Sequence, residues 1–432
     1  MIQELKNYSE VINVPEMKDS GIEWIGMIPK NWNVDKIKYH LKRNEPKNPG
    51  NVEVLSVYRE YGVIPKNSRD DNHNITSEDT SKYKYVKKGD LVINKMKAWQ
   101  GSMGVSEYEG IVSPAYFIYN FTDNYFDKKY FHFLIRNCYK DEFRRISGGI
   151  REGQWDLSAD LFADELVLIP PIKEQIKIVE FLNTKCAEID TLYSDIEKQI
   201  EILEEYKKSI ITEAVTKGLD PDVEMKDSGI EWMGMVPSTW ESNKVLNCID
   251  FIGGSQPPLS YFEGEEKEGY VRLIQNRDYK TDDYMTFVPK RMVTKFCEVD
   301  DVMIGRYGPP LFVLHRGLKG AYNVAIMKAV PKLLDREFMA FYLQNYTLLQ
   351  YIESFSKRTA GQAGVNTDIL KKYPIYVPPM EEQKEIAIYL EKKCIEIDNV
   401  IGKKKEQLET LEQYKKSLIY EYVTGKKEVS NE

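Results

Sequence analysis

The sequence contains few of the residues that build disulfide frameworks and metal centres. Its 432 residues include five cysteines and four histidines, and neither set shows the spacing of metal ligands. An odd number of cysteines without a CxxC pair argues against a disulfide framework or a zinc site. The cysteines are Cys138, Cys186, Cys248, Cys297 and Cys394. We therefore expect them to be buried core residues.

Long apolar runs and targeting signals are also missing. No apolar run reaches the roughly 18 residues that would suggest a transmembrane helix. The first residues carry charges but no apolar core of a signal peptide. We therefore expect a cytoplasmic protein without membrane contact.

The chain lacks the signatures of common enzyme classes. It has no G-x-x-x-x-G-K-[ST] phosphate loop, no H-E-x-x-H and no G-x-S-x-G. The Asn/Asp/Ser-Pro-Pro-Tyr/Phe tetrapeptide of amino-methyltransferases is absent too. Residues 221–226 imitate the Pro-Asp and Glu-x-Lys of a nuclease site, but these acidic residues are too close in sequence to converge from neighbouring strands. We expect no catalytic residue, metal or cofactor in this chain.

The charge balance excludes a uniformly basic surface. The formal net charge is −8, with 42% apolar and 30% charged residues. This composition is that of an ordinary globular protein. A local basic cleft remains compatible with it, because acidic helices elsewhere account for much of the negative total.

The chain does contain a tandem repeat at a constant offset of 208 residues. Residues 16–32 return as 224–240 with 13 of 17 positions identical. Residues 169–218 return as 377–426 with 23 of 50 identical. The regions between these framework segments have equal length but have diverged. The chain therefore divides into an N-terminal framework segment (1–32), a first variable region (33–168), a central framework region (169–240), a second variable region (241–376) and a C-terminal framework region (377–432).

The longer framework segments predict two long helices. Each opens with Pro-Pro, which suits a first helical turn, and continues with apolar residues at steps of three or four. This spacing predicts helices over about 172–216 and 380–423. An apolar seam this long needs a partner, and its own copy is the simplest one. We expect the seam to contain Leu182, Cys186, Ile189, Ile200 and Leu203, then Leu390, Cys394, Ile397, Leu408 and Leu411, and the same spacing includes Ile172 and Ile176.

The shorter framework segment combines turn residues with aromatic anchors. Asp19-Ser20-Gly21 is typical of a turn, and Trp24, Pro29 and Trp32 suggest an anchored, irregular segment. Because 224–240 follows the first long helix, the duplication predicts that 16–32 lies near the end of the second. The two ends of the chain should then be close together.

Each variable region has a mixed α/β pattern. Segments rich in β-branched and aromatic residues predict strands, and helical spacing predicts helices. The expected strands are 52–58, 91–93, 111–121, 270–274 and 302–304, and the expected helices are 126–145 and 338–352.

Loops in both variable regions carry side chains that suit nucleic acids. Lysine and arginine bind phosphates, and arginine, asparagine and glutamine also pair with base edges. Any single residue of this kind is more often an ordinary solvated side chain, so the clusters weigh more than their members. Gln256, which follows two glycines, and Arg277, which ends a polar triplet after a strand, are the strongest candidates. The full set is Lys66, Asn67, Arg69, Lys95, Lys97, Gln100, Arg151, Gln154, Gln256, Arg272, Gln275, Asn276, Arg277, Arg306, Lys357, Arg358 and Gln362.

The repeated framework resembles the specificity subunit of type I restriction-modification systems. The motifs that carry the resemblance are Lys-Asp-Ser-Gly-Ile-Glu-Trp at 18–24 and its copy at 226–232, Pro-Pro…Glu-Gln at 170–175 and 378–383, and Tyr-Lys-Lys-Ser near both helix ends. They cover nearly the whole chain in duplicate.

This resemblance implies an α+β fold and a non-catalytic function. Two mixed α/β target-recognition domains, 33–168 and 241–376, would each read one half of a bipartite site in double-stranded DNA. Two long antiparallel coiled-coil helices, each roughly 66 Å long, would set the spacer in a pseudo-twofold tandem repeat. The implied partners are two modification (methyltransferase) subunits, which use S-adenosylmethionine to methylate adenine, and restriction (endonuclease/translocase) subunits, which use ATP and Mg.

Two other interpretations compete with DNA recognition. The chain could be a coiled-coil scaffold whose variable regions bind proteins, and it would then bind no DNA. It could also be a free-standing nuclease or methyltransferase, which the missing cofactor motifs oppose. Salt-sensitive binding to DNA distinguishes recognition from the scaffold.

Overall fold

A computed structural model describes residues 16–429, except 51, 60, 69–78, 150–154, 231–232, 309, 356–357 and 360–361. The chain forms two compact units of similar size. Unit 1 contains residues up to Asp195 together with Glu406 onward, and unit 2 contains Ile196–Lys405. Each unit therefore holds one variable region and parts of both framework copies.

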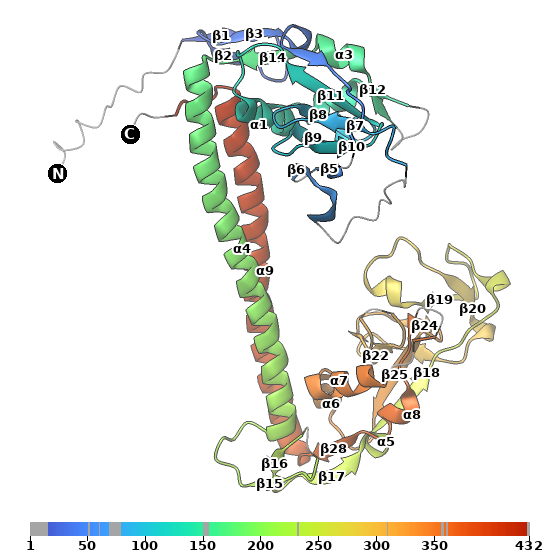
Figure 1. Cartoon of the computed structure of the whole chain (residues 1–432). Coiled ribbons are helices and arrows are strands. Elements are labelled where there is room, and N and C mark those ends of the chain that lie inside the picture. Colours follow the sequence, from blue (N-terminus) through green and yellow to red (C-terminus); the bar gives the residue numbers. More distant parts are fainter. Residues whose placement is uncertain are drawn as a thin grey trace, which may run out of the picture. The chain divides into compact units, whose positions relative to one another are not determined.

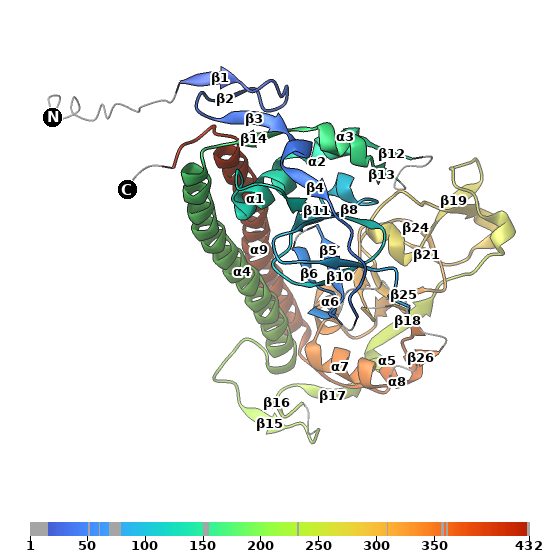
Figure 2. The ribbon, with the colours of Figure 1, turned by 45° about the horizontal axis from the view of Figure 1, so that its top comes forward.

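Two long helices, α4 (Ile172–Lys217) and α9 (Met380–Val423), contribute one part to each unit. In unit 1 the start of α4 lies beside the end of α9 (Figures 1 and 2), where the rings of Phe181 and Tyr422 are 4.4 Å apart. In unit 2 the end of α4 shares a core with the start of α9 through Ile211 and Leu390. The helices are therefore antiparallel within each unit.

Burial along the expected seam is graded. Leu182, Cys186, Ile189, Leu390, Cys394 and Ile397 are buried. Ile200, Leu203, Leu408 and Leu411 are only half-buried. Ile172 and Ile176 lie in the first turns of α4 and are each 43% exposed, so they do not belong to the buried seam. Inclusion of these two residues in the apolar pattern was wrong.

The same ion pair joins the two helices in both units. Lys207 Nζ lies 2.7 Å from Asp398 in unit 2, and Lys415 Nζ lies 2.5 Å from Asp190 in unit 1. The two pairs are related by the 208-residue repeat. Exposed ion pairs of this kind contribute about 0–1 kcal/mol each, so they favour one register of the helices more than they stabilise them.

The variable region of unit 1 is built on a four-stranded antiparallel sheet of order β4-β11-β8-β9. Its strands are β4 (Leu41–Arg43), β8 (Leu91–Asn94), β9 (Met103–Val105) and β11 (Tyr116–Phe121). Around it lie three strand pairs: β5 (Leu55–Tyr58) with β6 (Gly62–Pro65), β7 (Lys84–Val86) with β10 (Gly110–Val112), and β12 (Ser147–Gly148) with β13 (Asp156–Leu157). The helices are α1 (Lys128–Cys138), α2 (Lys140–Arg145) and α3 (Ala159–Asp164).

Unit 2 repeats the same sheet as β18-β25-β22-β23. Its strands are β18 (Ile249–Gly253), β22 (Val302–Gly305), β23 (Leu314–His315) and β25 (Ile326–Pro331). A second sheet, β20-β19-β24-β21, contains β19 (Tyr270–Ile274), β20 (Phe287–Pro289), β21 (Phe296–Cys297) and β24 (Gly320–Tyr322). The remaining elements are β26 (Arg358–Thr359) with β27 (Gln362–Ala363), α5 (Val245–Cys248), α6 (Arg336–Tyr342), α7 (Tyr346–Ser354) and α8 (Thr367–Leu370).

The central sheets differ in one buried polar pair. In unit 1 the Asp90 carboxylate accepts a hydrogen bond from the amide of Asn120. In unit 2 the matching Asp301 forms an ion pair with Lys328 at 2.7 Å. Burial raises the pKa of Asp90, and the backbone N–H of Lys87, the amide of Asn120 and the charges of Lys128 and Lys87 oppose this effect. Asp90 therefore has a neutral amide as its side-chain partner, whereas Asp301 has a cation.

The short framework segments are hairpins. β1 (Met17–Asp19) pairs with β2 (Met27–Pro29), and β15 (Met225–Asp227) pairs with β16 (Met235–Pro237). The prediction of an irregular segment was wrong here, since strands of three residues are too short to show alternation in the sequence. Each variable region is closed by a further pair: β3 (Asn33–Lys36) with β14 (Leu166–Ile169), and β17 (Glu241–Lys244) with β28 (Pro374–Val377).

The end of α9 contacts the first hairpin, as the duplication predicted. Lys426 Nζ donates to the backbone carbonyls of Ile25 and Met27, and Tyr420 Oη donates to that of Trp24. Both described ends of the chain thus lie in one part of unit 1.

Three sequence-predicted elements are divided in the structure. The predicted helix 126–145 breaks at Tyr139 into α1 and α2, and 338–352 breaks at Asn345, whose side chain caps α7. The predicted strand 111–121 divides into β10 and β11 around Ser113-Pro114. In the last two cases the helix cap at Asn345 and the proline at 114 interrupt an element that the residue pattern predicted as continuous. Among the described residues, no helix is long and apolar enough to cross a membrane.

Candidate nucleic-acid interface

A buried glutamine attaches each variable region to its long helix. In unit 1 Gln175, which is fully buried, donates from Nε2 to the carbonyls of Tyr125 and Pro170 at 2.8 and 2.7 Å. Its Oε1 accepts from the N–H of Asp127 at 2.8 Å. Asp127 in turn caps α1. One side chain therefore connects the start of α4 to the first helix of the variable region.

Unit 2 contains the same attachment. Gln383 donates to the carbonyls of Pro378 and Leu333, and its Oε1 accepts from the N–H of Asp335 at 2.7 Å. Asp335 caps α6 as Asp127 caps α1. We call these two arrangements the glutamine joints.

A tryptophan reinforces each joint. Trp32 Nε1 donates to Glu174 at 3.0 Å, and Trp240 Nε1 donates to Glu382 at 3.0 Å. Both indoles are almost fully buried. These contacts explain why Glu-Gln and the second tryptophan are identical in the two framework copies, while many neighbouring positions differ.

The candidates Lys95, Lys97 and Gln100 of unit 1 follow the central strand β8. Lys97 is exposed, whereas Lys95 Nζ forms an ion pair with Asp156 at 2.8 Å. Two tryptophans lie in the same place: the rings of Trp99 and Trp155 are 5.5 Å apart. The structure therefore places cations, an amide and aromatic faces together, as single-stranded or duplex nucleic acid requires. Lys66 and Asn67 lie apart from them, in a short 3₁₀ helix after β6.

In unit 2 several candidates gather around the end of the central strand β22. Arg306 follows this strand, and its Nη1 donates to the carbonyl of Val324 at 3.3 Å. Its guanidinium lies 5.5 Å from the ring of Tyr307. A Cβ on Gly253 would lie 3.9 Å from Arg306 Nη1, so the glycine loop that leads to the exposed Gln256 lies beside this arginine.

Asn276 completes this group. A Cβ on Gly305 would lie 3.0 Å from Asn276 Oδ1, which is buried and has no hydrogen-bond partner among the described residues. Nε of Arg306 is likewise buried without a described partner. Two buried polar atoms next to the end of β22 therefore lack a hydrogen-bond partner among the described residues, which is unusual in a folded protein.

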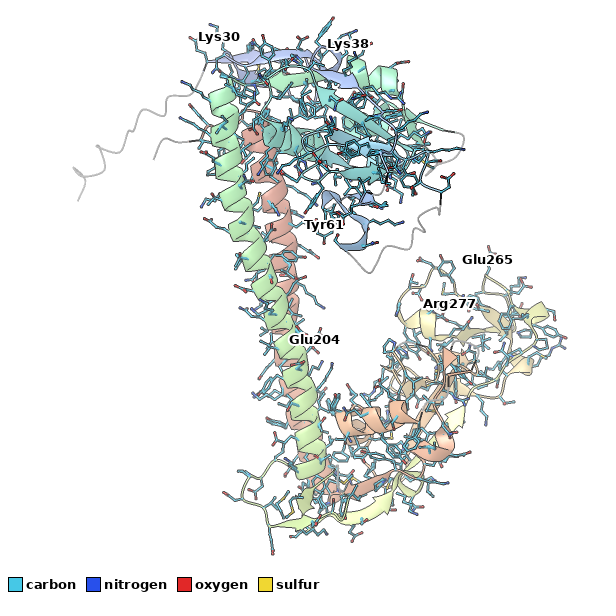
Figure 3. All side chains as sticks on the ribbon, viewed as in Figure 1. Lys30, Lys38, Tyr61, Glu204, Glu265 and Arg277 are labelled. Carbon is cyan, nitrogen blue, oxygen red and sulfur yellow. The ribbon has the colours of Figure 1, made fainter. Side chains whose placement is uncertain are left out.

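The other candidates on this side of unit 2 make internal contacts. Arg272 forms an ion pair with Asp282, and Gln275 takes part in a capping box with Asp278. Arg277 is half-exposed and donates to the carbonyl of Tyr284. Figure 3 shows Arg277 beside the loop that carries Glu265. Arg272 and Gln275 are therefore structural in this conformation, while Arg277 keeps an exposed face.

Some candidates cannot be placed. Arg69, Arg151, Gln154 and Lys357 lie outside the described residues. Arg358 and Gln362 belong to the pair β26 and β27, of which only the backbone is described.

Lys95 and Arg306 occupy the same position in the two units. The N–H of Lys95 donates to Ala115 and that of Arg306 to Ala325, each in the segment just before the neighbouring strand. The carbonyl of Lys95 accepts from Leu157, and that of Arg306 accepts from Val365, both at 2.9 Å. Both units thus present a cation at the same end of the same sheet. The sequence repeat obscures this match, since it needs an offset of 211 at these residues instead of 208.

Sequence reasoning missed Asp156, Trp155 and the purpose of the two glutamines. Asp156 is far from Lys95 in sequence, so only the folded structure reveals the ion pair. The glutamines were visible as identities in both framework copies, but identity alone does not show which groups they contact.

These features define a class of protein. It is a duplicated recognition protein, in which two divergent binding surfaces are attached by identical joints to a pair of antiparallel helices. The surfaces carry cations, amides and aromatic rings.

Comparisons with known proteins place the chain within this class. Residues 300–410 match the family model of the type I restriction modification DNA specificity domain. The putative type I restriction enzyme MjaX specificity subunit of Methanocaldococcus jannaschii is 25% identical and covers 98% of this chain and 93% of that protein. The MjaVIII specificity subunit of the same organism is also 25% identical, over 94% of this chain and 95% of its own length.

Solved structures share the fold. A chain from a study of complex assembly and conformational transition in the type I R-M system superposes with a TM-score of 0.67 at 14% identity, covering 92% of this chain and 98% of its own. The HsdS subunit from Thermoanaerobacter tengcongensis gives a TM-score of 0.50 at 15% identity, with the same coverage. Over nearly its whole length the chain is therefore similar to specificity subunits of type I restriction enzymes, as its repeated motifs indicated.

Proposed function

We propose that this chain recognises a bipartite DNA site, one half with each unit. The observation that carries this proposal is the repeated placement of polar and cationic groups at one end of the central sheet: Lys95 with Lys97 in unit 1, and Arg306 with Asn276 in unit 2. Cations position phosphates, and amides and guanidinium groups pair with base edges. Because the two surfaces differ, the two halves of the site should differ in sequence.

The catalysis belongs to other subunits in this proposal. The relatives are specificity subunits of restriction enzymes, and this chain supplies recognition instead of chemistry. We infer that modification subunits, which bind S-adenosylmethionine, and restriction subunits, which use ATP and Mg, assemble with it. The two helices would then set the number of base pairs between the two half-sites.

The test is single-molecule sequencing of methylated bases in host DNA, with the gene present and deleted. We expect one asymmetric, split motif to lose its adenine methylation when the gene is deleted. A second experiment measures binding of the assembled complex to a duplex that carries this motif at several salt concentrations. Unchanged methylation together with no salt-sensitive binding would refute DNA recognition and favour a protein-binding scaffold.

A further inference from the structure

The two units present unequal cations at their matched position, although their backbones coincide there. Lys95 of unit 1 has a carboxylate partner, Asp156 Oδ2, 2.8 Å from its Nζ. Arg306 of unit 2 makes no ion pair with any residue that the structure describes, and it rests on Tyr307. The difference lies in the residue before the shared backbone contact: Asp156 precedes Leu157, whereas Gly364 precedes Val365.

Unit 2 has no room for the carboxylate that unit 1 uses. Tyr307 forms a β-bridge with Gly364, and a Cβ on this glycine would lie 3.0 Å from the tyrosine ring. A longer side chain at 364 would therefore clash with Tyr307 unless the ring moved. Tyr307 therefore crowds, in unit 2, the position that corresponds to Asp156 in unit 1.

We propose that the residue after the central strand is a DNA-phosphate contact in unit 2, through Arg306, and that Asp156 masks the equivalent contact of Lys95 in unit 1. This inference rests on the proposed function, because it requires that both surfaces face DNA. A lysine neutralised by a neighbouring carboxylate releases no counterion from DNA, whereas a free arginine releases about one. Asp156 thus lowers the electrostatic contribution of unit 1 to the free energy of DNA binding. The affinity of unit 1 for its half-site then depends more on contacts to bases.

The ion pair is exposed enough to be removed without unfolding the protein. The side chains of Lys95 and Asp156 are 32% and 47% exposed, and surface pairs of this kind are weak. Asp164 offers a matched control in the same unit. It pairs with Lys36 and Lys38 and not with Lys95, its side chain is 53% exposed, and it is the last residue of α3. Asp164→Asn therefore changes the net charge equally without touching the proposed contact.

The experiment measures the slope of log Kobs against log salt concentration for the full chain assembled with its modification subunits. The probe is a duplex that carries the motif obtained by methylation sequencing. We expect Asp156→Asn to steepen the slope by about 0.9 and Arg306→Gln to flatten it by about 0.9. Between 50 and 200 mM salt, this difference in slope changes the ratio of the variant's affinity to that of wild type by about 3.5-fold. Lys95→Gln combined with Asp156→Asn removes both charges and should restore the wild-type slope.

Other outcomes overturn the inference in distinct ways. Equal slopes for Asp156→Asn and Asp164→Asn would show that Asp156 masks nothing. Weaker binding after Asp156→Asn would show that the carboxylate itself contacts the DNA. If Lys95→Gln combined with Asp156→Asn flattened the slope below that of wild type by as much as Arg306→Gln does, Lys95 would already contact a phosphate in the wild-type protein. Absence of salt-sensitive binding by the wild-type complex would instead refute the proposed function itself.

Discussion

Removal of one glutamine joint should weaken unit 2 locally and by a measurable amount. Gln383→Met keeps the length and the helical propensity of the side chain but removes its donor and its acceptor. The N–H of Asp335 and the carbonyls of Pro378 and Leu333 then lose the glutamine as a partner in a site that is 1% exposed. Two good hydrogen bonds and one long one, each contributing about 0.5–1.5 kcal/mol, predict a loss of about 2–4 kcal/mol.

Two measurements on the purified chain test this prediction. Urea unfolding gives the loss of stability, and hydrogen exchange of peptides that cover Asp335–Phe338 shows whether the loss begins at the cap of α6. We expect faster exchange there than in wild type, and little change in the matching peptide of unit 1. Gln413→Met, on an exposed face of the same helix, is the matched control and should stay within about 0.5 kcal/mol of wild type.

A charged variant sharpens the test. Gln383→Glu would bury a carboxylate against the carbonyls of Pro378 and Leu333, so it should destabilise unit 2 more than Gln383→Met does at neutral pH. Burial raises the pKa of this carboxyl group, and its neutral form can donate again. The difference between Gln383→Glu and wild type should therefore shrink as the pH falls. If Gln383→Met exchanged and unfolded like wild type, the joint would not be a structural attachment.

The remaining predictions concern the sheets and the seam. Asn120→Lys should give Asp90 a cationic side-chain partner, as Lys328 is for Asp301 from a neighbouring position of the strand, and should lower the pKa of Asp90. Roughly 1 kcal/mol of stability should then appear at pH 7 and be lost as the pH falls through the new pKa, which urea unfolding at pH 7 and pH 3 measures. Gly402→Ala should stabilise the protein by about 0.8–1 kcal/mol in the same assay, because a Cβ there meets nothing within 4 Å in the middle of α9. Leu390→Ala, at a fully buried position, should cost about 2–5 kcal/mol, and Leu203→Ala, at a half-buried position, clearly less. Equal losses at these two positions would refute the graded burial of the seam.

The long-range architecture could be predicted because the framework segments occur twice in the sequence. An exact offset of 208 residues reveals the repeat without any structural knowledge, and apolar steps of three and four residues reveal α4 and α9. The central strands β8 and β22 were equally visible as short apolar runs, and β19 as a segment rich in β-branched and aromatic residues. These features depend on local sequence patterns that no tertiary contact overrides.

The functional surfaces were harder to predict because they depend on contacts across the fold. Arg272 and Gln275 have the right chemistry for bases, yet Asp282 and Asp278 already hold them. Conversely, the match between Lys95 and Arg306 is hidden by a three-residue insertion and appears only when their backbone hydrogen bonds are compared. Residue type predicts what a side chain can bind, but the fold decides which groups are still available.

The glutamine joints also affect how two linked binding surfaces of low affinity can together bind DNA with high affinity. Once one half-site is bound, the second reader experiences an effective concentration of its own half-site, and this concentration depends on how stiffly the reader is held. A buried side chain with three hydrogen bonds at each attachment limits the range of orientations that the reader samples. A stiff attachment raises the effective concentration of the second half-site at one spacer length and lowers it at all other spacer lengths. Discrimination between spacer lengths would then arise at two glutamines that touch no base.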